Sequence, residues 1–181
     1  KRPIVIVGGG GWNATAVYNV QSFAERNQLP VSAAFRFQSL FDNTHDNYVG
    51  DVGIGINPKL AKRVKEADLI LAIGPRLGEM TTGGYTLLNI PVPEQDLVHV
   101  YPGAEELGRL YKPVQAINAG MPAFARALAD IEPVSGNWSE QTQKGRAEYL
   151  EWSEPTDVPG PVNLGKVVQY LRECMGPGDV M

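Results

Sequence analysis

The chain has 181 residues, of which 43% are hydrophobic and 20% charged, and its formal net charge is −4. The length suits one domain with a full-sized core, or one domain with an appendage. A negative net charge argues against nucleic acid or an anionic membrane as the main partner. The single cysteine, Cys174, excludes an internal disulfide framework and a cysteine-based zinc site, so we expect a cytoplasmic location.

The chain opens on a wholly apolar, β-branched run, Pro3-Ile-Val-Ile-Val, followed at once by Gly8, Gly9, Gly10 and Gly11. Such a run predicts a strand buried on both faces, as a parallel sheet requires. Glycines directly after it let the backbone turn sharply and present bare N–H groups at the start of a helix, which is how α/β folds hold phosphates and dinucleotides. The spacing departs from G-x-G-x-x-G, so the run predicts an α/β domain without specifying a dehydrogenase.

The rest of the chain repeats this alternation of strand and helix. Further strands are expected at residues 30–35, 68–74, 97–101 and 114–117, and helices at 13–27, 57–67, 104–109, 121–130, 139–153 and 163–175. Asn13 and Asn57 are the expected N-caps of the first two helices. Residues 36–56 have no clear period and predict a long ordered connection. The pattern indicates a doubly wound, Rossmann-like parallel sheet of five or six strands with helices on both faces.

Right-handed crossovers bring the C-terminal ends of all the parallel strands to one edge of the sheet. The glycine run Gly8–Gly11 lies at that edge together with Gly74, Arg76, Tyr101 and Asn118, and we predict that these residues bind a diphosphate. Arg76 would offer a fork of donors to phosphate, or a plane that stacks on adenine. Two structural explanations compete with this one: the glycines serve only a tight turn, and Arg76 pairs with a carboxylate from another domain.

Other conspicuous residues are expected to have structural roles. His45 and His99 are far apart in sequence and predict structural hydrogen bonds rather than acid–base chemistry. Trp12 is expected to pack against a neighbouring subunit, and the threonines at 81–82 to cap a following helix. The basic residues within 59–65 are typical of a solvated helix face.

The chain changes character near residue 133. Residues 135–161 combine a polar helix with a proline-rich stretch and predict a linker, and residues 162–181 carry an amphipathic helix and the start of a β-like run. The chain also begins directly before a strand. We therefore expect an excised part of a longer protein, with a nucleotide-binding-like domain at 1–134.

The order of these motifs resembles the central domain of thiamine-diphosphate-dependent enzymes, the acetolactate synthase and pyruvate oxidase superfamily. Four segments carry the resemblance: residues 2–10, 67–80, 99–108, and the connection that holds Phe41-Asp-Asn-Thr-His45 with Gly50 and Gly53. Together they extend over roughly the first three quarters of the chain. The resemblance implies that residues 162–181 begin the diphosphate-binding domain that follows the central domain in such enzymes.

The resemblance also implies a cofactor and a reaction for the longer parent. Such enzymes bind thiamine diphosphate and Mg²⁺ through domains on either side of the central one, and act on 2-oxo acids by making or breaking a carbon–carbon bond beside a carbonyl. No catalytic residue or metal ligand is then expected in this chain, which would space the catalytic domains and support contacts in a homo-oligomer. Its partners would be the N- and C-terminal domains of the parent.

The family's central domains bind FAD, ADP or no nucleotide. Members that bind FAD usually carry an aspartate-rich run after the fourth strand and a Gly-Asp pair after the fifth, where this chain has Tyr101-Pro-Gly and Ala119-Gly120. Two other functions stay open from the residues alone. One is an interaction domain without a ligand. The other is a free-standing NAD-binding enzyme of the sirtuin type, although the paired CxxC motif of a zinc site is missing.

Overall fold

The computed structural model describes residues 1–134, 136–176 and 178–179, which divide into two compact units, Lys1–Tyr149 and Leu150–Met181. Residue 135, where the predicted linker begins, and residues 177 and 180–181, at the expected β-like run, lie outside the described part. The domain boundaries expected near residues 134 and 161 stay a prediction. Within the described residues, no helix combines the length and apolar character needed to span a bilayer.

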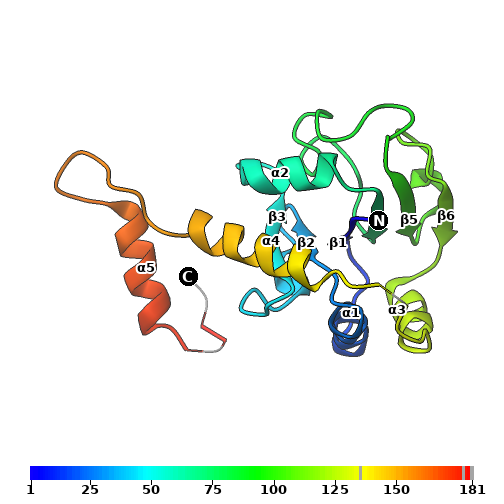
Figure 1. Cartoon of the computed structure of the whole chain (residues 1–181), viewed down its shortest axis with the longest axis horizontal. Helices are drawn as coiled ribbons and strands as arrows, with labels where there is room; N and C mark the ends of the chain where they lie inside the picture. Colours follow the sequence, from blue (N-terminus) through cyan, green and yellow to red (C-terminus); the bar gives the residue numbers. More distant parts are fainter. Residues whose placement is uncertain (135, 177, 180–181) are drawn as a thin grey trace. The chain divides into compact units, whose positions relative to one another are not determined.

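Six parallel strands form a single sheet in the first unit (Figure 1). They are β1 Pro3–Val7, β2 Val31–Ala34, β3 Tyr48–Val52, β4 Leu69–Ile73, β5 Asp96–Tyr101 and β6 Gln115–Asn118, in the spatial order β3-β2-β1-β4-β5-β6. The order reverses between β1 and β4, which pair from Pro3 opposite Leu69 to Val7 opposite Ile73. This confirms the predicted Rossmann-like α/β fold, and such sheets bind ligands at the carboxyl edge beside the reversal.

Helices cover both faces of the sheet. The helices of the chain are α1 Ala14–Arg26, α2 Pro58–Lys65, α3 Met121–Ala129, α4 Ser139–Trp152 and α5 Leu164–Cys174. Figure 1 shows α1 and α3 on one face and α2 on the other. Both expected caps are confirmed, because the Asn13 side chain accepts from the Ala16 N–H at 2.8 Å and the Asn57 side chain from the Lys59 N–H at 2.9 Å.

The core explains why the first strand is apolar at every position. Val5 and Val7 belong to the hydrophobic cluster under α1 and α3, whereas Ile4 and Ile6 belong to the cluster under α2. All four are at most 1% exposed. A strand covered on both faces has no solvated side on which a polar residue would be favoured, and each such burial contributes about 1.5–3 kcal/mol.

Three local expectations are wrong. The supposed connection at 36–56 contains the edge strand β3, whose Gly50 and Asp51 interrupt any apolar run. The helix expected at 104–109 is reduced to the 3₁₀ turn Ala104–Glu106. Turns rather than a helix connect β4 to β5, so the threonines at 81–82 cap no helix, and both the N–H and the hydroxyl of Thr82 bond to the Gly78 carbonyl.

The first turns of α4 belong to the first unit and pack on the rest of it mainly through polar contacts and small residues. Thr142 donates its hydroxyl proton to the Gln28 carbonyl at 2.7 Å, and the Gln141 amide donates to the Pro3 carbonyl at 2.8 Å. Gly145 faces Val49 so closely that a Cβ there would lie 2.8 Å from a Val49 methyl carbon. An interface of this kind leaves no apolar stripe in the sequence, which is why α4 has the composition of a solvated helix.

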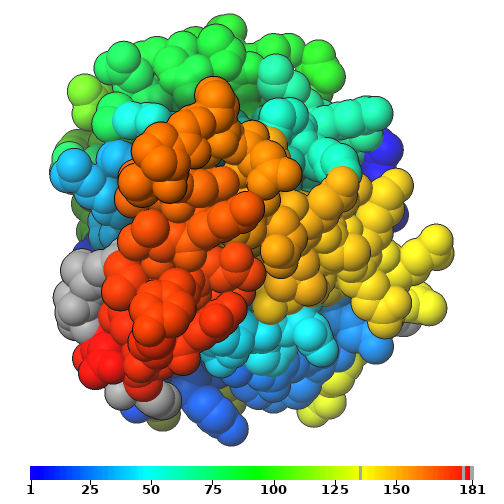
Figure 2. Space-filling model, turned by 90° about the vertical axis from the view of Figure 1, so that its left-hand side faces the viewer, coloured from blue at the N-terminus to red at the C-terminus, as the bar shows by residue number. Residues whose placement is uncertain are grey.

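The second unit exposes much of its apolar surface. Asn163 caps α5 by accepting from the Lys166 N–H at 3.2 Å, and its amide donates to the Thr156 carbonyl at 2.8 Å. None of the residues of α5 is buried, and Leu164 is 71% exposed. Figure 2 shows this segment in orange and red.

Candidate functional site

A pocket of about 350 Å³ opens at the carboxyl edge of the sheet. Its walls come from the turns that follow β1, β2 and β4 and from the end of β5. The pocket is lined by Gly9, Gly10, Ala34, Phe35, Phe37, Pro75, Arg76, Met80, Thr81 and Tyr101. Four of the eight residues predicted from the sequence are therefore brought together here, whereas Gly8, Gly11, Gly74 and Asn118 do not line the pocket.

Three glycines let the turns after β1 and β4 pass in close contact. A Cβ on Gly8 would lie 2.8 Å from the Cβ atoms of both Ala34 and Pro75, and a Cβ on Gly74 would lie 2.6 Å from the Met121 sulfur. A Cβ on Gly9 would collide with the Gly74 carbonyl. Gly9 and Gly74 also have φ angles of +71° and +85°, a region that favours glycine. Packing alone accounts for these three glycines.

The other two glycines of the run have a different environment. A Cβ on Gly10 or Gly11 would meet no atom within 4 Å. Among the described residues, neither backbone N–H donates a hydrogen bond. Helix α1 begins only three residues later, so these two N–H groups lie just before a helix N-terminus, where anions are favoured. Packing does not require a glycine at position 10.

Trp12 is accounted for inside its own chain. Its indole N–H donates to the Gly8 carbonyl at 2.8 Å, and its ring packs against the hydrophobic cluster under α1. The ring thus holds the start of the glycine turn against the body of the domain. The intersubunit contact expected of Trp12 stays a prediction.

Arg76 lines the pocket, and side chains of the same chain hold its guanidinium group in place. Its Nε donates to the Tyr101 hydroxyl at 2.8 Å, and its guanidinium carbon lies 5.8 Å from the centre of the Tyr101 ring. Glu106, only 8% exposed, has a carboxylate oxygen 3.8 Å from that Nε and 3.3 Å from Arg109 Nη1. Within this chain, Glu106 is the carboxylate that pairs with Arg76, whereas a carboxylate from another domain stays a prediction.

These contacts keep the guanidinium cationic. The hydrogen bond with the Tyr101 hydroxyl raises the pKa of Arg76 above its ordinary value, and the neighbouring charges of Tyr101 and Glu106 raise it further. The Arg76 side chain is 66% exposed, and within the described residues its two terminal NH₂ groups donate no hydrogen bond. They are the donors best placed to meet an anion in the pocket.

The exposed Asn118 and the buried His99 brace the neighbouring turns. The Asn118 amide donates to the carbonyls of Tyr101 and Pro102, at 3.0 and 2.9 Å, so it braces the turn after β5 instead of reaching the pocket. His99 Nε2 lies 2.9 Å from the Pro75 carbonyl, and because a carbonyl only accepts, this nitrogen carries the proton. Burial lowers the pKa of His99, so the ring stays neutral.

His45 also has a structural environment. Its Nδ1 accepts from the Asn47 N–H at 3.1 Å, and its Nε2 lies 2.9 Å from a Glu25 carboxylate oxygen. The structural hydrogen bonds expected of both histidines are confirmed. Among the residues that the structure describes, no group of three or more histidine, cysteine, aspartate or glutamate side chains could hold a metal ion.

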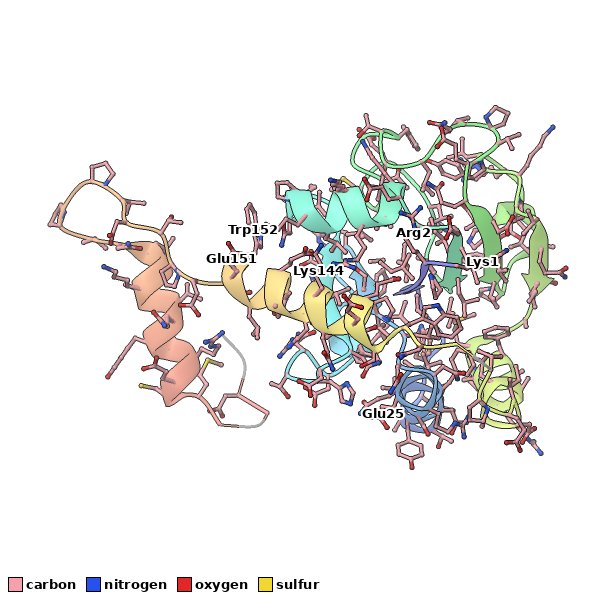
Figure 3. All side chains as sticks on the ribbon, in the orientation of Figure 1. Lys1, Arg2, Glu25, Lys144, Glu151 and Trp152 are labelled. Carbon is pink, nitrogen blue, oxygen red and sulfur yellow. The ribbon has the colours of Figure 1, made fainter. Side chains whose placement is uncertain are left out.

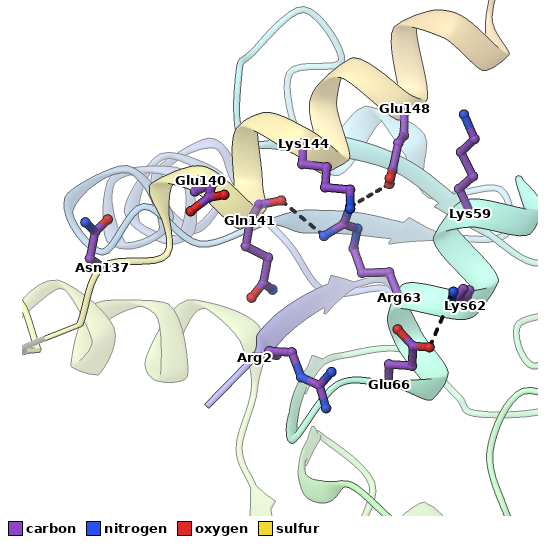
Figure 4. A pocket seen from close by; sticks show the side chains of 10 residues that line it. All are labelled: Arg2, Lys59, Lys62, Arg63, Glu66, Asn137, Glu140, Gln141, Lys144 and Glu148. Atoms are coloured by element: carbon purple, nitrogen blue, oxygen red, sulfur yellow. Dashed lines mark hydrogen bonds and ion pairs between the residues drawn. The ribbon is translucent and has the colours of Figure 1, made fainter.

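A second pocket, of about 560 Å³, lies between α2 and α4 (Figure 4). Arg63 forms its floor, donating to a Glu148 carboxylate oxygen at 2.5 Å and to the Gln141 carbonyl at 3.1 Å. The Arg63 side chain is 12% exposed, so Arg63 is the exception to the mostly solvated basic face expected on 59–65. Four further cations lie in the wall, namely Arg2, Lys59, Lys62 and Lys144. Arg2 and Lys144 are also labelled in Figure 3.

The close contact of the two glycine turns predicts that two alanine substitutions differ in their effect on stability. Gly74→Ala places a methyl group against the Gly8 carbonyl and the Met121 sulfur at an unfavourable φ, so we expect a loss of about 3 kcal/mol in the free energy of unfolding. Gly10→Ala places its methyl group in open space, so we expect a change below about 0.5 kcal/mol. Urea denaturation of both variants measures the difference, and equal losses would show that the turns relax freely.

The lowered pKa of His99 makes stability depend on pH. Below the ordinary histidine value the unfolded chain binds a proton that the folded chain excludes, so the free energy of unfolding falls as the solution becomes acidic. Glutamine can still donate to the Pro75 carbonyl without titrating. Between about pH 7.5 and about pH 5, we expect the urea midpoint of the wild type to fall further than that of His99→Gln. Parallel pH profiles of the two proteins would contradict this.

Residues 1–128 match the family model described as thiamine pyrophosphate enzyme, central domain. The acetolactate synthase large subunit of Parasynechococcus marenigrum is 28% identical over 179 residues, which cover 96% of this chain and 28% of that protein. The pyruvate decarboxylase of Aspergillus fumigatus is 31% identical over 182 residues, covering 91% and 32%. The chain thus spans less than a third of the length of these relatives. It belongs to the family of thiamine pyrophosphate enzyme central domains.

Proposed function

We propose that this chain is the central domain of a longer enzyme that resembles acetolactate synthase and acts on 2-oxo acids with thiamine diphosphate and Mg²⁺. The observation that carries the proposal is the family match over residues 1–128, together with relatives named acetolactate synthase and pyruvate decarboxylase. When bound, thiamine diphosphate supplies the chemistry that makes or breaks the carbon–carbon bond beside the carbonyl. In this proposal the parent is cytoplasmic, and its domains on either side of the central one hold the cofactor and Mg²⁺.

In this proposal residues 1–134 are a scaffold that spaces the catalytic domains and supports a homo-oligomer, and residues 162–181 begin the next domain. The helix α5 supports the second point. Leu164, Val167 and Val168 are 71%, 42% and 43% exposed, although the helix is amphipathic. An eleven-residue helix is marginal by itself in water, so its apolar face needs a partner surface. The following domain of the parent is the natural source of that surface.

The enzymatic part of the proposal is tested on the full-length polypeptide that contains this chain. We expect it to consume pyruvate or another 2-oxo acid and to release carbon dioxide or a carboligation product, with dependence on added thiamine diphosphate and Mg²⁺. Gas evolution and product analysis by mass spectrometry measure both outcomes. Inactivity with pyruvate and with a panel of longer 2-oxo acids, in protein that binds the cofactor, would overturn the assigned reaction class.

We further propose that the carboxyl-edge pocket binds the adenosine diphosphate part of FAD, or ADP itself. A volume of about 350 Å³ lies at the small end of the range for ligand pockets, so it suits part of a dinucleotide rather than the whole. Within the pocket Gly10 offers an N–H donor that has no partner among the described residues, and Arg76 offers its terminal NH₂ groups. No carboxylate lines the pocket, so the recognition of a ligand here rests on its phosphate groups.

Titration of the chain with FAD and with ADP tests the pocket. We expect saturable binding in isothermal titration calorimetry, and Arg76→Ala should weaken the affinity for ADP about tenfold, because it removes charge-assisted hydrogen bonds to phosphate. Arg126→Ala is the matched control, since Arg126 is an exposed arginine of α3 that does not line the pocket. If neither nucleotide binds the wild type, the domain is a structural module without a ligand.

A further inference from the structure

The turn that follows β2 holds an arginine where the backbone favours glycine. The Phe37 N–H donates to the Ala34 carbonyl at 2.9 Å, which closes a four-residue turn with Arg36 at its third position. Arg36 has a φ of +67°, and only two other non-glycine residues in the described part of the chain, Gln28 and Tyr85, have a positive φ. Turns of this kind strongly prefer glycine or asparagine at that position. The φ of Arg36 is thus an outlier for a non-glycine residue, and it lies beside the candidate site.

The side chain of Arg36 is available to a ligand. Its two neighbours, Phe35 and Phe37, both line the carboxyl-edge pocket. The guanidinium carbon lies 5.2 Å from the centre of the Phe35 ring, so the aromatic wall of the pocket supports the charge. Arg36 is exposed, and no acidic side chain among the described residues pairs with it. The turn therefore carries an unpaired guanidinium group beside the pocket.

The position of Arg36 after the second strand suggests which part of a nucleotide it would contact. In doubly wound sheets that bind dinucleotides, the residue after the second strand reads the adenosine ribose: an acidic residue accepts the 2′-hydroxyl, whereas an arginine accommodates a phosphate on that ribose. This sheet has the same strand order, with β2 beside β1. No acidic residue lines the pocket, and the residue in question is Arg36. An arginine at this position is therefore suited to bind a phosphate on the ribose.

We propose that Arg36 binds a phosphate group on the adenosine ribose, so that the pocket prefers a ribose-phosphorylated adenosine nucleotide to one with free ribose hydroxyls. This inference rests on the proposed nucleotide pocket and adds its ligand class. The two arginines then bind different parts of the ligand. Arg76 and the N–H groups after β1 bind the 5′-phosphates, and Arg36 binds the ribose phosphate.

The test compares three probes in calorimetric titrations of the 181-residue chain. They are ADP, adenosine 2′,5′-bisphosphate and adenosine 3′,5′-bisphosphate, which all carry two phosphate groups, so a difference in affinity reports where the second phosphate is attached. We expect one of the two bisphosphates to bind about fivefold more tightly than ADP, the contribution of one exposed charge pair.

Arg36→Gly is the decisive variant, because glycine adopts this φ without steric cost and the fold is preserved. We expect the variant to bind ADP as the wild type does and to lose the preference for a bisphosphate. Arg36→Lys should keep part of it, since an ammonium group lacks the planar fork. Arg126→Ala, on α3, serves again as the matched control and should leave all three affinities unchanged.

Each remaining outcome decides against the inference in a distinct way. If neither bisphosphate binds more tightly than ADP, the pocket has no preference for a ribose phosphate, and the nucleotide pocket itself stands. If the preference persists in Arg36→Gly, another group reads the phosphate. If none of the three probes binds, the pocket and the inference are both overturned.

Discussion

The close approach of the turns after β1 and β4 is the constraint on which the rest of the site depends. Gly8 and Gly74 leave no room for a Cβ, and Gly9 passes directly over the Gly74 carbonyl. Any larger residue at these positions would push the two strand ends apart at the place where the sheet reverses its order. Because β1 and β4 are central strands, that displacement would spread to both hydrophobic clusters. The contact therefore couples the shape of the pocket to the stability of the domain.

The other walls of the pocket are held by polar side chains that satisfy backbone groups. His99 secures the carbonyl of Pro75, Asn118 secures the turn after β5, and Glu106 lies between Arg76 and Arg109. Each of these groups is already bonded within the chain. In the described part of the chain, the exposed ends of Arg36 and Arg76 and the N–H groups of Gly10 and Gly11 remain without a hydrogen-bond partner at this edge. A rigid frame with cationic ends suits a ligand that brings its own negative charge.

Local patterns predicted most of the fold, whereas long-range contacts decide what the patterns missed. The apolar run of β1 and the caps at Asn13 and Asn57 depend on neighbours in sequence, so they could be recognised. The strand β3 and the buried face of α4 could not, because Gly50 and Gly145 owe their positions to side chains brought from distant segments. The same holds for the site: its location followed from topology, but the strained turn after β2 left no signal in the sequence.

The two explanations of the glycine run, a tight turn and a phosphate site, apply to different glycines. Packing requires Gly8 and Gly9, and a φ of +80° favours glycine at position 11, so three of the four glycines are explained without any ligand. Gly10 has neither a positive φ nor a nearby atom that a side chain would strike, so folding places no demand on it. A residue that folding leaves free, but that lines a pocket beside an exposed arginine, is best explained by the close approach of something to its backbone. The proposal of a nucleotide pocket therefore depends on Gly10 and Arg76, whereas the other glycines of the run serve the turn itself.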